Sequence, residues 1–124
     1  QKGLVAEVTQ ADVLTHQPER PFDAVYEQTC LCAIHPDHWV RYAGQLHRWI
    51  RPGGALWALF MQRPRPEAVE QGLIEGPPYH GDINAMRALF PQSATGGWVW
   101  PKPPYPQVPH PQLMHELAVR LQRT

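Results

Sequence analysis

The sequence lacks the features that mark membrane, exported and polyanion-binding proteins. None of its apolar runs approaches the roughly 20 residues that a membrane-spanning helix needs, and no basic and then apolar leader opens the chain. Its 11 Lys and Arg residues balance 11 Asp and Glu residues, so no overall basic field favours nucleic acid or anionic lipid. We therefore expect a cytoplasmic protein that binds neither nucleic acid nor a membrane.

Cysteine is also scarce. The two cysteines, Cys30 and Cys32, are one residue apart, so a disulfide between them would close almost no loop. With His35 and His38 they form C-x-C-x2-H-x2-H, four residues of types that bind zinc. Zinc sites usually space their cysteines two to four residues apart, and a strand followed by a helix start would not bring these four together. We therefore favour small buried apolar cysteines over a metal site.

Proline is in excess in a chain of 124 residues, a length that suits one domain with a modest core. There are 15 prolines where about six are usual, and six of them fall in 101–111. Apolar residues make up 43% of the chain and occur in periodic runs, so disorder does not explain the composition. We expect residues 1–124 to form a single domain with 101–111 as an ordered connection. A polyproline ligand for an SH3 or WW domain is the alternative.

Apolar periodicity predicts alternating strands and helices. Alternating or continuous apolar runs predict strands at 4–13, 22–34, 55–61 and 116–121. Three- and four-residue spacing predicts a helix that begins near Pro36 and ends at Pro52–Gly54, and a short helix between Asp82 and Pro91. A strand, helix, strand unit places parallel strands in one sheet. The predicted fold class is therefore α/β, with a mostly parallel sheet and flanking helices.

Candidate site residues are those at which an apolar run turns polar, because ligands of open α/β sheets lie beyond the carboxyl ends of the strands. Such places are Asp12, 26–29 and 60–62, and we expect the proline-stiffened loop 76–80 to lie over them. A carboxylate near the end of a buried strand is costly unless it is hydrogen-bonded or at an edge. This cost favours a functional position for Glu27 over a purely structural one.

Three motifs occur in order along the chain: VYEQTCLCAIHP at 25–36, RPGGALWALFMQ at 51–62 and GPPYH-x-D at 76–82. In this order the sequence resembles the thiopurine S-methyltransferase family of class I S-adenosylmethionine-dependent methyltransferases, whose members methylate thiols, selenium compounds or halides. The resemblance runs from about Ala11 to Phe90. It implies a partial Rossmann-like class I methyltransferase sheet and S-adenosylmethionine as the cofactor.

The chain departs from the family pattern in two places. The Gly-rich turn after the family's first strand and the acidic residue after its second strand, which hold the cofactor, have no counterpart here. The chain therefore corresponds to the C-terminal portion of the domain, the cofactor site is incomplete in this chain, and we expect the truncated form to be inactive. Gln28 stands where the family often has an arginine that faces the substrate, which weakens recognition of an anionic acceptor by charge.

The resemblance implies a role for each matched residue. Glu27 and Gln28 are the catalytic candidates, beside the sulfonium and the methyl group, and Asp12 would lie near the adenine. The implied cofactor contacts are Asp12, Val13, Glu27, Gln28 and Thr29. The implied acceptor pocket consists of Gln28, Phe60, Met61, Gln62, Pro78 and Tyr79, with Trp98 and Trp100 further away. The expected chemistry is an in-line displacement at the methyl carbon, which benefits when water is excluded from a soft nucleophile.

The sequence thus predicts a methyltransferase-like protein that transfers a methyl group to a small-molecule acceptor, namely a thiol, a selenium compound or a halide. The alternative is a non-catalytic binding or assembly module derived from a methyltransferase. In the family pattern, the first and second strands would cover the flank of residues 22–27. We therefore expect a bare apolar edge there, and with it a homodimer through this edge or a rearranged N-terminal strand.

Overall fold

A mixed five-stranded sheet is the centre of the structure, a computed structural model that describes residues 6–112 and 114–124. Its strands are β1 (Phe22–Glu27), β2 (Ile50–Gln62), β3 (Trp98–Val99), β4 (Gln107–His110) and β5 (Met114–Arg123). The helical elements are the 3-10 turns η1 (Leu31–Ala33) and η2 (Pro36–His38) and the helices α1 (Trp39–Trp49), α2 (Pro66–Glu70) and α3 (Ile83–Leu89).

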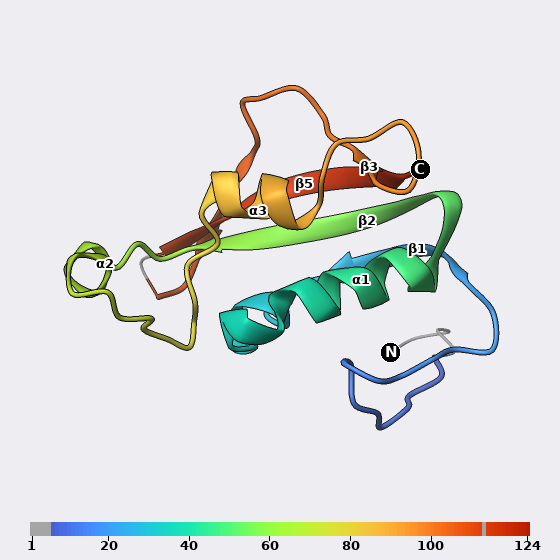
Figure 1. The fold of residues 1–124 in the computed structure, drawn as a ribbon, viewed down its shortest axis with the longest axis horizontal. Helices are drawn as coiled ribbons and strands as arrows, with labels where there is room; N and C mark the ends of the chain where they lie inside the picture. The colour runs from blue at the N-terminus through green and yellow to red at the C-terminus, as the bar shows by residue number, and fades with distance from the viewer. Residues whose placement is uncertain (1–5, 113) are drawn as a thin grey trace.

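The long strands β2 and β5 lie side by side in the middle of the sheet (Figure 1). β1 pairs with β2 in parallel, whereas β5 runs antiparallel to β2, β3 and β4. The predicted α/β class and the predicted parallel pair are therefore confirmed. The sheet is mixed because the closing strand, expected from its alternating residues, runs antiparallel to β2.

The helices α1 and α3 cover one face of the sheet in the part of the chain that the structure describes. Leu56 and Ala58 point to this face, where they share one buried apolar cluster with Leu46 of α1 and Met86 of α3. On the opposite face Trp57 is 50% exposed. The core thus lies between the sheet and its two helices.

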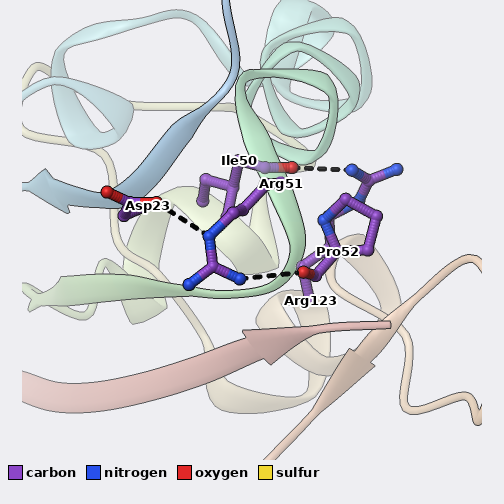
Figure 2. Close-up of polar contacts among 5 residues, drawn as sticks. All are labelled: Asp23, Ile50, Arg51, Pro52 and Arg123. Atoms are coloured by element: carbon purple, nitrogen blue, oxygen red, sulfur yellow. Dashed lines mark hydrogen bonds and ion pairs between the residues drawn. The ribbon is translucent and has the colours of Figure 1, made fainter.

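Arginines fix the end of the sheet at which β2 begins (Figure 2). The Arg51 guanidinium donates to the Asp23 carboxylate at 2.7 Å and to the Pro52 carbonyl at 3.1 Å. From β5, Arg123 donates to the Ile50 carbonyl at 2.7 Å. The Arg51–Asp23 pair is exposed, so it contributes at most about 1 kcal/mol to stability. Its position links β1 to β2 at the end opposite the candidate site.

The predicted strand at 4–13 is wrong where the structure describes it. Residues 6–12 are exposed and form no strand, and residues 4 and 5 lie outside the described residues. Asp12 instead closes a turn, because its carboxylate accepts from the Leu14 N–H at 2.9 Å and its carbonyl accepts from the His16 N–H at 2.8 Å. A strand needs a neighbouring ladder, and among the described residues no strand pairs with this segment.

Two predicted boundaries are also wrong. The strand predicted at 22–34 ends at Glu27, after which Thr29 adopts a φ of 62° and the chain turns into η1. The helix predicted to end at Pro52–Gly54 ends at Trp49, and the proline and glycines lie inside β2. Gly54 is required there because a Cβ atom would lie 2.7 Å from the Asp23 carbonyl oxygen of β1. Gly54 therefore serves close strand packing, and Gly53 adopts a positive φ of 83° inside β2, so neither glycine terminates the helix.

The proline-rich segment 101–111 is an extended connection that includes β4. β4 pairs with the first residues of β5, with Val108 opposite Glu116 and Pro109 opposite His115. An edge strand tolerates proline because one side of its backbone needs no ladder partner. The predicted single domain over 1–124 stays a prediction. No helix among the described residues is long and apolar enough to cross a membrane.

Candidate functional site

Glu27 is buried at the carboxyl end of β1, with 4% of its surface exposed. Its Oε1 accepts from the Leu31 N–H at 2.6 Å and from the Tyr42 hydroxyl at 3.1 Å. Its Oε2 has no hydrogen-bond partner among the described residues. Burial raises the pKa of Glu27, although the hydrogen bonds from Leu31 and Tyr42 oppose the shift. The carboxyl group thus holds the turn η1 against α1 and keeps one oxygen without a partner.

Gln28 links β1 to a second buried carboxylate, Glu116 of β5. The Gln28 side-chain Nε2 donates to Glu116 Oε1 at 3.2 Å, and its Oε1 accepts from the Tyr26 hydroxyl at 2.7 Å. Glu116 is 2% exposed, and its Oε2 also has no partner among the described residues. The sequence reasoning missed Glu116, because an acidic residue in an alternating strand is typical of a solvent-facing position.

The two carboxylates influence each other and the nearby thiols. The negative charge of Glu116 adds to the burial that raises the pKa of Glu27. Burial, together with both carboxylates, raises the pKa of the Cys32 thiol to about 11, so Cys32 is a thiol rather than a nucleophilic thiolate at neutral pH. Cys32 is buried, as predicted, and Cys30 is half-buried. Within 6–112 and 114–124, no group of three His, Cys, Asp or Glu residues could hold a metal ion.

The loop 76–81 lies across the end of β2 and against η1. The Tyr79 N–H donates to the Cys32 carbonyl and the Gly81 N–H donates to the Met61 carbonyl, both at 2.8 Å. A small cavity is lined in part by Cys32, Met61 and Tyr79. The Gln62 side chain donates to the Gly81 carbonyl at 2.9 Å, which fixes the loop further. The structure therefore brings the predicted loop to the carboxyl end of β2.

Other acceptor candidates lie around this loop or in the core. The Pro78 carbonyl accepts from Arg65 Nη2 at 2.9 Å. The Phe60 ring is 1% exposed and lies 6.1 Å from the Trp100 ring and 5.8 Å from the Phe90 ring. Trp98 belongs to the same buried cluster. Phe60 therefore lines the small cavity from within the core and Trp100 packs on its ring, whereas Trp98 lies opposite Arg123 at the other end of the sheet.

The predicted cofactor contacts Asp12, expected near the adenine, and Val13 are not hydrogen-bonded to this group among the described residues. The Val13 carbonyl accepts from the Gln45 side chain of α1 at 3.3 Å, and Asp12 closes its own turn. No hydrogen bond among the described residues joins Asp12 or Val13 to Glu27, Gln28 or Thr29. The structure thus assembles Glu27, Gln28 and the loop 76–81, to which Glu116 is added.

The fold is that of class I methyltransferases. One similar solved structure comes from work on the conversion of a disulfide bond into a thioacetal group during echinomycin biosynthesis, with a TM-score of 0.65 and 24% identity over 98% of this chain and 58% of that chain. Another is Burkholderia thailandensis 1,6-didemethyltoxoflavin-N1-methyltransferase with its substrate and S-adenosylhomocysteine, with a TM-score of 0.59 and 19% identity over 92% of this chain and 49% of that chain. A third is the S-adenosylmethionine-dependent methyltransferase SibL, with a TM-score of 0.50 and 17% identity over 91% of this chain and 34% of that chain.

A family model settles the relationship more closely. The model of the thiopurine S-methyltransferase family matches residues 3–95. The chain therefore belongs to this family, as its motifs predicted, and is methyltransferase-like in fold and sequence. It spans 58% or less of the length of the similar solved structures described above. No curated protein sequence matches the chain.

Proposed function

We propose that this protein transfers a methyl group from S-adenosylmethionine to a small nucleophile at the carboxyl ends of β1 and β2, and that the acceptor is a thiol, a selenium compound or a halide. The observation that supports this most is that Glu27 and the loop 76–81 both hydrogen-bond to η1, beside the carboxyl ends of β1 and β2 in a class I methyltransferase sheet. Ligands of such sheets lie beyond the carboxyl ends of the strands.

The residues present fit part of the cofactor. Glu27 Oε2 is a buried carboxylate oxygen without a partner among the described residues, which suits the positive charge of a sulfonium group. S-adenosylmethionine, when bound, supplies an electrophilic methyl group on that sulfonium. The family elements that hold the methionine end and the ribose have no counterpart in the sequence. We therefore propose that the site of residues 1–124 is incomplete and that this stretch alone is inactive.

The chain's own groups would align and shield the acceptor. Tyr79 and Met61 line the small cavity beside the strand end and would exclude water from a soft nucleophile. Gln28 would position the acceptor through its amide, because its hydrogen bonds to Tyr26 and Glu116 hold the side chain in one orientation. An in-line displacement depends on such positioning more than on a strong base.

An assembly role is the second candidate function. Among the described strands β1 lies at an edge of the sheet, and Phe22 and Tyr26 on it are 47% and 65% exposed. An unpaired edge with apolar side chains readily pairs with another strand. We propose a homodimer through β1 as the form that such a module would take.

Calorimetric titration with S-adenosylmethionine and S-adenosylhomocysteine tests the proposed function, together with the intact mass of the purified natural protein. If the mass exceeds the 14.2 kDa of residues 1–124, we expect micromolar binding, followed by transfer of a labelled methyl group to at least one of a thiol, selenite or iodide, whereas residues 1–124 alone should show neither. Glu27→Gln should weaken binding of the sulfonium cofactor more than binding of the neutral product. The exposed control Glu70→Gln should change neither affinity. Absence of both binding and transfer in the natural protein would leave the assembly role.

A further inference from the structure

Glu116 is the strongest feature of the described residues that the family's expected roles do not use. One of its carboxylate oxygens accepts from Gln28, and the other is buried without a partner among the described residues. An unpartnered carboxylate oxygen inside a protein is costly, and proteins retain few of them. Glu116 lies beside the carboxyl end of β2, opposite its register partner Met61. The unpartnered oxygen of Glu116 therefore indicates a ligand at the carboxyl end of β2 that donates a hydrogen bond.

The charges around Glu116 narrow the chemistry of that ligand. The three ion pairs among the described residues are His35–Asp37, Arg51–Asp23 and Arg65–Glu75, and none includes Glu27 or Glu116. Arg65, which donates to the Pro78 carbonyl of the loop, is paired with Glu75 through Nη1 at 3.2 Å, while its buried Nε has no partner among the described residues. The carboxyl ends of β1 and β2 thus hold two buried carboxylates, Glu27 and Glu116, and among the described residues neither has a cation in hydrogen-bond contact with it. An anion would be repelled at this edge, because like charges interact strongly where water is excluded.

We propose that Glu116 determines acceptor specificity, so that the site selects a neutral acceptor that donates a hydrogen bond and rejects a bare anion. This inference rests on the proposed function, and it favours a protonated thiol over a halide. The thiol proton would pass to Glu116 Oε2 as the sulfur gains the methyl group and the cofactor leaves as its neutral thioether. Gln28 supports the selection because its amide carries no charge and its Nε2 is already directed at Glu116. An arginine at position 28 would neutralise Glu116 and reverse the preference.

Binding without turnover tests the inference directly. The natural protein, labelled with ¹⁵N, is titrated separately with 2-mercaptoethanol and with iodide while the side-chain amide signals of Gln28 are followed. The variants are Glu116→Gln and Gln28→Arg, and the control is Glu70→Gln, which removes the same charge from an exposed position. In Gln28→Arg, the backbone signal of residue 28 replaces the amide signals. Thermal unfolding verifies that each variant is folded.

We expect the thiol to shift the Gln28 signals of the natural protein and iodide to leave them unchanged. Loss of a hydrogen bond to a charged group corresponds to about a tenfold or larger loss of affinity, so Glu116→Gln should weaken thiol binding by that factor. Gln28→Arg should bind iodide. If Glu116→Gln does not fold, the Gln28→Arg result decides alone, because Gln28 is exposed and tolerates substitution.

Equal binding of iodide and thiol by the natural protein would overturn the inference, as would a Gln28→Arg variant that still rejects iodide. A parallel assay of methyl transfer from S-adenosylmethionine separates this inference from the proposed function. Transfer to iodide and to the thiol at equal rates contradicts the inference alone. Selective thiol binding without transfer to any acceptor contradicts the proposed function alone.

Discussion

Replacing Glu27 by glutamine tests how the structure tolerates a buried carboxylate. The glutamine Oε1 can still accept from the Leu31 N–H and the Tyr42 hydroxyl, so the turn η1 keeps its anchor. Two charge-assisted hydrogen bonds become neutral ones, which costs about 1 kcal/mol each. In return the variant replaces the charged oxygen without a partner, which costs about 1 to 3 kcal/mol or more, by a neutral amide nitrogen, whose burial costs less than that of a charge. These opposing contributions are of similar size.

The raised pKa of Glu27 decides the sign of the change. In the folded state its pKa lies above the ordinary value of 4.5, chiefly because of burial, so ionisation of this side chain is less favourable in the folded protein than in the unfolded chain. As the pH rises from 4.5 through the folded pKa, the folded protein binds more protons than the unfolded chain. Stability from this group is therefore fully present at low pH and is lost as the pH rises.

We expect Glu27→Gln to raise the free energy of unfolding at pH 8 by about 1 kcal/mol, or the melting temperature by about 4 °C. The variant should also lose part of the decrease in stability between pH 5 and pH 8. Urea unfolding at several pH values, followed by tryptophan fluorescence, measures both effects against the Glu70→Gln control. A Glu27→Gln protein that is less stable than the natural protein at pH 8, with an unchanged pH dependence, would refute the reasoning.

Three further predictions concern the sheet and its core. Gly54→Ala should destabilise the fold by about 1 to 3 kcal/mol in thermal unfolding, because its Cβ would lie 2.6 Å from Ile50 Cγ2 and 2.7 Å from the Asp23 carbonyl oxygen. Leu46→Ala, at a position with 0% exposure, should cost about 2 to 5 kcal/mol in the same measurement. Light scattering should show a homodimer that Phe22→Lys on the edge strand β1 converts to a monomer, and a natural protein that is monomeric at all concentrations would contradict this.

Local sequence signals predicted the elements whose causes are local. Asp82 begins α3 as expected, because its carboxylate accepts from the Asn84 and Ala85 N–H groups. The end of β1 was missed because it depends on the contact between Glu27 and Tyr42, which are 15 residues apart. Without knowledge of the contact between Glu27 and Tyr42, the apolar run at 22–34 predicts one continuous strand. Strand termination here is a tertiary effect, and periodicity carries no information about it.

The candidate site was half predictable for a related reason. The rule that ligands lie beyond the carboxyl ends of parallel strands led to Glu27, Gln28 and Met61, which the structure places at one edge. β5 runs antiparallel to β2, so the first residues of β5 lie at the carboxyl end of β2. Glu116, near the beginning of β5, therefore lies at the same end of the sheet as Glu27 and Met61, which are near the carboxyl ends of β1 and β2. Strand direction, which no alternating pattern encodes, is what brings the second carboxylate to Gln28.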